Sequence, residues 1–130
     1  EATGGSHMTM TVAGHYRIPY EEAEVLKTQP EKEAEIFPVI KATVEKMALI
    51  TEKFLKGYQV PAVYVVGGSS MFTEFTSVFE KRLHLPVYRP VHPLLVTPLG
   101  IAYCCQLPEL SSKKRSEIKN VFNFVKSFKH

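Results

Sequence analysis

The sequence predicts an α/β domain that is rich in helix and carries a small parallel sheet. Two short apolar runs, residues 62–66 and residues near 86–89, have the β-branched and aromatic composition of buried strands. Segments with helical periodicity flank and separate these runs, as they do in α/β proteins. Since only two strands are indicated, we expect a sheet that is incomplete. A length of 130 residues fits one domain with a real core.

Composition narrows the class of protein. With 45% hydrophobic and 22% charged residues, the chain is typical of a globular domain and unlike a disordered one. No apolar run approaches the ~20 residues of a membrane helix, and the first residues lack the pattern of an export signal. We therefore expect a cytoplasmic protein with no membrane span.

The net charge of +3 is unevenly distributed. Residues 111–130 contain six lysines and arginines against a single acid, Glu117, and the rest of the chain is slightly acidic. An excess of basic over acidic residues that is confined to one end of the chain does not indicate a nucleic-acid-binding domain. We expect no nucleic-acid partner.

Three helices are predicted before the first strand. A short helix over residues 6–16 has Ser6 as its expected N-cap. A second helix over residues 20–27 has acids early and a lysine late, as the helix dipole favours. A long helix follows over about residues 31–56. Pro38 is expected to kink this helix or to restart it as a first-turn residue.

The second half of the chain alternates between strand and helix. Apolar residues at helical spacing predict a helix from Phe72 to Leu83 between the two strands. Residues 94–107 predict an apolar, buried helix. Residues 112–129 predict a basic amphipathic helix. The expected organisation is one domain over residues 1–107, followed by a C-terminal helical segment over residues 108–130.

The strongest local motif is Gly67-Gly68-Ser69-Ser70, which directly follows the first strand. Two glycines allow a ligand or another backbone to come close. If a helix begins at this point, its N-terminal N–H groups suit a phosphate or nucleotide. A tight turn without a ligand explains the same four residues, so the pattern leaves both interpretations open.

Residues 63–102 carry a family resemblance. The run contains Val-Gly-Gly-Ser-Ser-Met-Phe, then Leu-Pro-Val-Tyr-Arg-Pro, then Thr-Pro-Leu-Gly-Ile-Ala. It resembles the end of the ethanolamine-utilisation EutJ family and, more distantly, DnaK-type chaperones and bacterial actins. The resemblance implies a partial second lobe of an actin-like ATPase. It also implies that Gly67, Gly68 and Ser69 lie beside the adenine and ribose of ATP or ADP, with Met71 near the base.

Two upstream segments extend this resemblance. The Gly4-Gly5 turn is similar to the turn that lies beside the phosphates and ribose in these families. Glu24 and Lys27 are similar to the acid and lysine that hold the ribose hydroxyls. Residues three apart share a helix face, which is compatible with that role. Without the resemblance, Glu24 and Lys27 would be interpreted as a solvated surface pair.

The chain also departs from the family pattern. It contains no Asp-x-Gly-Gly-Gly-Thr hairpin, the type of segment that handles the phosphates and magnesium in these families. If the family order holds, those segments would precede Glu1. The scattered histidines have no metal-ligand spacing, so we expect no metal site in this chain. Its magnesium ligands and catalysis would have to come from elsewhere, and whether the chain is an enzyme stays open.

Two functions follow as alternatives. The first is a chaperone-like protein that retains the adenosine side of an ATP-binding cleft, with other ethanolamine-utilisation or microcompartment proteins as partners. The second is a non-catalytic interaction or oligomerisation module derived from such a lobe. A strand without partners exposes unpaired backbone groups, so we expect self-association or pairing with a missing piece.

Overall fold

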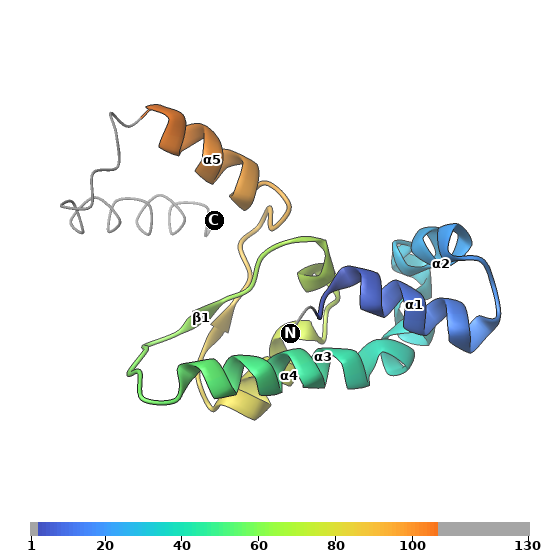
Figure 1. The fold of residues 1–130 in the computed structure, drawn as a ribbon, viewed down its shortest axis with the longest axis horizontal. Helices are drawn as coiled ribbons and strands as arrows, with labels where there is room; N and C mark the ends of the chain where they lie inside the picture. Colours follow the sequence, from blue (N-terminus) through green and yellow to red (C-terminus); the bar gives the residue numbers. More distant parts are fainter. Residues whose placement is uncertain (1–2, 107–130) are drawn as a thin grey trace.

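The computed structural model describes residues 3–106, which form a helical body, a two-stranded sheet and a projecting helix (Figure 1). In chain order the elements are α1 (Gly5–Tyr16), α2 (Tyr20–Lys27), the 3-10 helix η1 (Pro30–Lys32), α3 (Glu33–Leu55), β1 (Val63–Tyr64), the 3-10 helix η2 (Gly68–Met71), α4 (Phe75–Leu83), β2 (Val87–Tyr88) and α5 (Val96–Gln106). The predicted helix-rich α/β class with a small parallel sheet is confirmed. The predicted C-terminal segment over residues 108–130 lies outside the described residues.

Helix α1 packs against both α2 and α3. Met8 and Val12, one turn apart, are fully buried in this contact together with Ala23 of α2. The predicted N-cap is wrong, because α1 begins one residue before Ser6. Gly4 is the cap, and its carbonyl accepts the N–H groups of His7 at 3.0 Å and Met8 at 3.2 Å.

Helix α3 is the central element of the body (Figure 1). Ile36, Ile40, Val44 and Ala48 follow one another at four-residue spacing and are buried between α1 and α4. Pro38 lies inside the helix on its exposed side, so the expected first-turn restart is wrong. The α-helix begins at Glu33, because η1 occupies the residues before it.

The sheet consists of β1 and β2, which run parallel with Val63 opposite Val87 and Tyr64 opposite Tyr88. Val63 N–H donates to the Pro86 carbonyl and Val65 N–H donates to the Tyr88 carbonyl, both at 2.9 Å. The strands are shorter than predicted, and β1 is half-buried rather than fully buried. Within residues 3–106 β1 has a single partner strand, so one of its edges is not covered by another strand.

Helix α5 lies at the predicted place, but its predicted burial is wrong. Leu94, just before the helix, is 57% exposed and Ile101 is 61% exposed. Figure 1 shows α5 projecting away from the helical body, beyond the end of the sheet. No element in the described range packs extensively against it, so its apolar surface is uncovered there. Burial depends on neighbouring elements, and the apolar composition of a segment does not supply them.

Arg89, directly after β2, clamps the segment that follows β1. Its Nη1 atom donates toward the carbonyls of Ser70 at 2.8 Å, Met71 at 2.7 Å and Phe72 at 3.1 Å. Hydrogen bonds from a charged donor are stronger than neutral ones. The guanidinium therefore fixes the path of the chain between η2 and α4.

We predict that Arg89→Met lowers the free energy of unfolding by about 2 kcal/mol, because it removes charged donors from three carbonyls. Arg82→Met is the matched control, since Arg82 pairs with the partly exposed Glu52 and its loss should cost less than about 1 kcal/mol. Urea denaturation measures both. Equal losses for the two variants would contradict a special role for Arg89.

Candidate functional site

A hollow of about 690 Å³ lies between the first two helices and the turn after β1. Six of the eight residues predicted for the nucleotide site line it. They are Gly5, Glu24, Lys27, Gly68, Ser69 and Met71. Gly4 and Gly67 do not line it. Gly4 caps α1, and Gly67 turns the backbone at a φ of 90°, a conformation that favours glycine.

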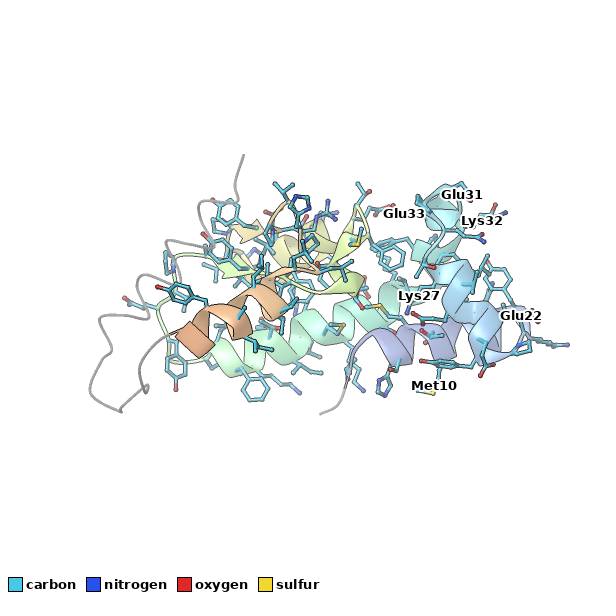
Figure 2. All side chains as sticks on the ribbon, turned by 90° about the horizontal axis from the view of Figure 1, so that it is seen from above. Met10, Glu22, Lys27, Glu31, Lys32 and Glu33 are labelled. Atoms are coloured by element: carbon cyan, nitrogen blue, oxygen red, sulfur yellow. The ribbon has the colours of Figure 1, made fainter. Side chains whose placement is uncertain are left out.

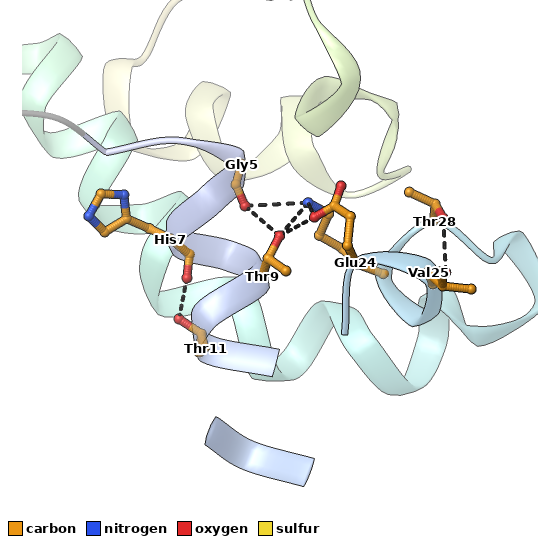
Figure 3. Close-up of polar contacts among 8 residues, drawn as sticks. Gly5, His7, Thr9, Thr11, Glu24, Val25 and Thr28 are labelled. Atoms are coloured by element: carbon orange, nitrogen blue, oxygen red, sulfur yellow. Dashed lines mark hydrogen bonds and ion pairs between the residues drawn. The ribbon is translucent and has the colours of Figure 1, made fainter. Parts of the chain in front are cut away.

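A polar cluster forms one side of the hollow (Figure 3). The ammonium of Lys27 donates to the Gly5 carbonyl at 3.3 Å, to Thr9 Oγ1 at 2.7 Å and to Glu24 Oε2 at 2.7 Å. Thr9 Oγ1 lies 3.0 Å from the Gly5 carbonyl and also donates to Glu24 Oε2. The cluster joins α1 to α2, so the packing of these two helices determines its geometry.

The two charged partners differ in exposure. The side chain of Lys27 is only 10% exposed, whereas that of Glu24 is 45% exposed. Hydrogen bonds from Lys27 and then Thr9 lower the pKa of Glu24, with burial opposing them and the positive charge of Lys27 adding to them. Glu24 is therefore ionised at neutral pH and offers a carboxylate to the hollow.

Glycines bring the two walls of the hollow together. A Cβ atom on Gly5 would lie 3.1 Å from Ser69 Oγ and 3.9 Å from Lys27 Nζ. A Cβ atom on Gly68 would lie 3.4 Å from Leu94 Cδ2. Gly5 is the first residue of α1 and Ser69 belongs to η2, so the start of α1 lies close to the turn that follows β1. A side chain at position 5 would push Ser69 away from α1.

The turn itself differs from the prediction in one respect. No α-helix begins at Gly67-Gly68, because residues Gly68–Met71 form a single 3-10 turn and α4 starts only at Phe75. The Ser70 N–H is used within the turn, where it donates to the Gly67 carbonyl at 3.2 Å. No helix dipole is therefore directed at the turn. What the turn can offer a ligand is the close approach of its backbone.

The hollow also has an apolar lining. Tyr20, Pro30, Met71, Phe72 and Leu94 contribute to its lining. Together with the polar cluster, they give a hollow lined by both hydrophobic and hydrogen-bonding groups, which is typical of small-molecule sites. Such a hollow can take a flat ring against its apolar residues and hydroxyl groups at its polar cluster.

Sequence reasoning missed several residues of this region. Thr9, Glu33 and Phe72 were not predicted, although Glu33 lines the hollow and accepts the N–H of Thr73. Thr9 lies one helical turn after Gly5, and this spacing places the two residues on the same helix face. The spacing alone does not show which face of α1 packs against α2, so it could not have identified Thr9 as part of the site.

The part of the chain that the structure describes contains neither a cluster of metal ligands nor a membrane-spanning helix. No group of three or more His, Cys, Asp or Glu side chains over residues 3–106 could hold a metal ion. None of the helices in that range is long and apolar enough to cross a membrane.

The sequence of the chain is similar to those of known proteins. No family model matches the chain. The chain is 43% identical over 103 residues to the ethanolamine utilization protein EutJ of Salmonella typhimurium and 41% identical over the same length to that of Escherichia coli K12. Each match covers 78% of this chain and 36% of the relative. The chain thus spans about a third of the length of these relatives.

A solved structure gives the same result. The crystal structure of EutJ from Carboxydothermus hydrogenoformans superposes with a TM-score of 0.74 at 48% sequence identity, covering 78% of this chain and 38% of that one. The predicted partial lobe agrees with this match over part of a longer fold. With 41–48% identity to these proteins over 78% of its length, the chain belongs to the ethanolamine-utilisation EutJ family.

Proposed function

We propose that the hollow binds the adenosine part of ATP or ADP, and that the chain supplies the nucleoside side of a chaperone-like EutJ protein. The observation that carries this proposal is the convergence of Gly5, the Glu24–Lys27 pair and the Gly68-Ser69 turn on one hollow. These segments are far apart in the sequence, so their convergence is a property of the fold.

The chemistry of the lining residues supports a nucleoside. The ionised carboxylate of Glu24 can accept hydrogen bonds from ribose hydroxyls, which are strong because the acceptor is charged. A purine ring would lie against the apolar lining residues, where the thioether of Met71 and the ring of Tyr20 offer favourable contacts. Different residues would thereby recognise the base and the sugar.

The described residues offer few binding groups for the phosphates of ATP or ADP. Lys27 is the lysine that lines the hollow, and its three donors are already engaged. No acidic cluster suited to magnesium exists among residues 3–106. We therefore do not assign ATP hydrolysis to these residues, and we propose that magnesium and the phosphates are held by other parts of a longer EutJ protein.

Adenosine, ADP and ATP are predicted to bind with affinities within about threefold of one another, because the phosphates add little free energy. Calorimetry with the three ligands tests this. 2′-Deoxyadenosine is the control, and it should bind about tenfold more weakly after losing a charge-assisted hydrogen bond. Absence of adenosine binding at millimolar ligand would refute the proposed site.

Glu24→Gln is predicted to weaken adenosine binding about tenfold, because a neutral amide replaces the charged acceptor. Glu22→Gln is the matched control on the same helix, and it should stay within about twofold. Figure 2 shows Glu22 at the outer end of the helical pair, away from Lys27.

The pH dependence follows from the same residue. The pKa of Glu24 is lowered, so binding by the native chain should be constant around neutral pH and above the ordinary carboxyl range. It should be lost only as the pH falls through the lowered pKa, where Glu24 becomes protonated. Calorimetry at several pH values shows whether Glu24→Gln removes this acid limb.

A second candidate function is self-association through α5. Leu99 and Ile101 are exposed on this helix, together with Leu94 and Leu95 just before it. Large exposed apolar side chains concentrated in one short segment often mark an interface. We propose a second copy of the chain as its occupant. Other ethanolamine-utilisation or microcompartment proteins in the cytoplasm are the partners proposed for a longer protein.

Leu95→Glu combined with Ile101→Glu is predicted to abolish concentration-dependent association, because it places charges in an apolar interface. Light scattering measures the mass. Met10→Glu is the control, since Met10 is an exposed apolar residue on the outer side of α1 (Figure 2). A chain without residues 111–130 should still associate. A native chain that stays monomeric at all concentrations would exclude this function.

A further inference from the structure

We propose that Thr9 is the positioning residue of this site: its hydroxyl fixes the Glu24 carboxylate in the orientation that receives the nucleoside, without contacting the nucleoside itself. This inference rests on the proposed function. Thr9 is 0% exposed and does not line the hollow. Its hydroxyl nevertheless contacts both members of the Glu24–Lys27 pair.

The protons of the cluster can be assigned from its contacts. Lys27 has three N–H donors, and three acceptors lie within reach, namely the Gly5 carbonyl, Thr9 Oγ1 and Glu24 Oε2. Thr9 has one O–H proton and two possible acceptors, the Gly5 carbonyl and Glu24 Oε2. Because Lys27 already serves the carbonyl, the hydroxyl proton goes to the charged carboxylate, where the bond is stronger.

This assignment gives the two oxygens of the Glu24 carboxylate different partners. Glu24 Oε2 accepts from both Lys27 and Thr9. The other oxygen points away from Thr9 in Figure 3 and is the one left to accept ligand hydroxyls. Lys27 has no donor left over for a ligand. The family resemblance implies that both residues hold the ribose, whereas this geometry gives that contact to Glu24 and makes Lys27 and Thr9 its supports.

Two side chains lower the pKa of Glu24. Helix α2 contributes Lys27, whose bond and charge favour the carboxylate, and α1 contributes the Thr9 hydroxyl. Tyr20 of α2 and Glu33 of α3 are the other titratable side chains that line the hollow. Loss of the Thr9 hydroxyl therefore leaves Lys27 as the remaining partner of Oε2.

The experiment compares Thr9→Val with Thr9→Ser and Thr11→Val in the full chain. Thr9→Val keeps the shape of the side chain and removes its hydroxyl, whereas Thr9→Ser keeps the hydroxyl. Thr11→Val is the matched control, because Thr11 is exposed on the same helix and its Oγ1 lies 2.8 Å from the carbonyl one turn back, that of His7, as Thr9 Oγ1 lies 3.0 Å from that of Gly5. Adenosine affinity is measured by calorimetry across pH, and the Glu24 carboxyl is titrated by NMR without ligand.

Thr9→Val should weaken adenosine binding about tenfold, and both the acid limit of binding and the Glu24 titration should move to higher pH. Thr9→Ser and Thr11→Val should match the native chain within about twofold. A purely structural role for Thr9 would lower stability without moving the titration midpoint. An unchanged midpoint and affinity in Thr9→Val would overturn the proposal.

Two further outcomes are informative. If the native chain does not bind adenosine, the proposed function fails, but the ligand-free titration of Glu24 still decides whether Thr9 supports the carboxylate. If Thr9→Val does not fold, Thr9→Ala removes the same hydroxyl without a β-branched side chain and gives the same comparison with Thr9→Ser.

Discussion

The ammonium of Lys27 is the interaction on which the polar side of the hollow depends. It is largely buried, and a buried charge is tolerated only where its donors are satisfied. Its three acceptors come from two helices, so α1 and α2 must keep their relative positions for the charge to remain paired. The carboxylate of Glu24 is thereby held at the surface of the hollow, where a ligand can reach it.

Most helices could be predicted from the sequence, because their apolar residues recur at helical spacing within each segment. The region over residues 20–27 and the stripe of α3 are examples in which local pattern and final structure agree. The burial of α5 could not be predicted in this way. Its apolar composition indicated a core helix, but burial requires a covering layer, and residues 3–106 do not provide one.

The candidate site was predictable where a resemblance pointed to it and unpredictable where only packing defines it. Gly5, Glu24, Lys27 and the Gly68-Ser69 turn carried recognisable motifs, and they line one hollow. Thr9 carried none, because a threonine within a helix is ordinary. Its importance follows from the face that α1 turns toward α2, and that face is fixed by contacts that sequence periodicity does not contain.

The close approach of Gly5 to Ser69 has a thermodynamic consequence. It places the beginning of α1 against the turn whose carbonyls accept hydrogen bonds from Arg89. A molecule seated between these walls would contact both, and it would have no comparable site in the unfolded chain. Occupancy would then shift the folding equilibrium toward the native state by mass action, so that the ligand acts as part of the scaffold.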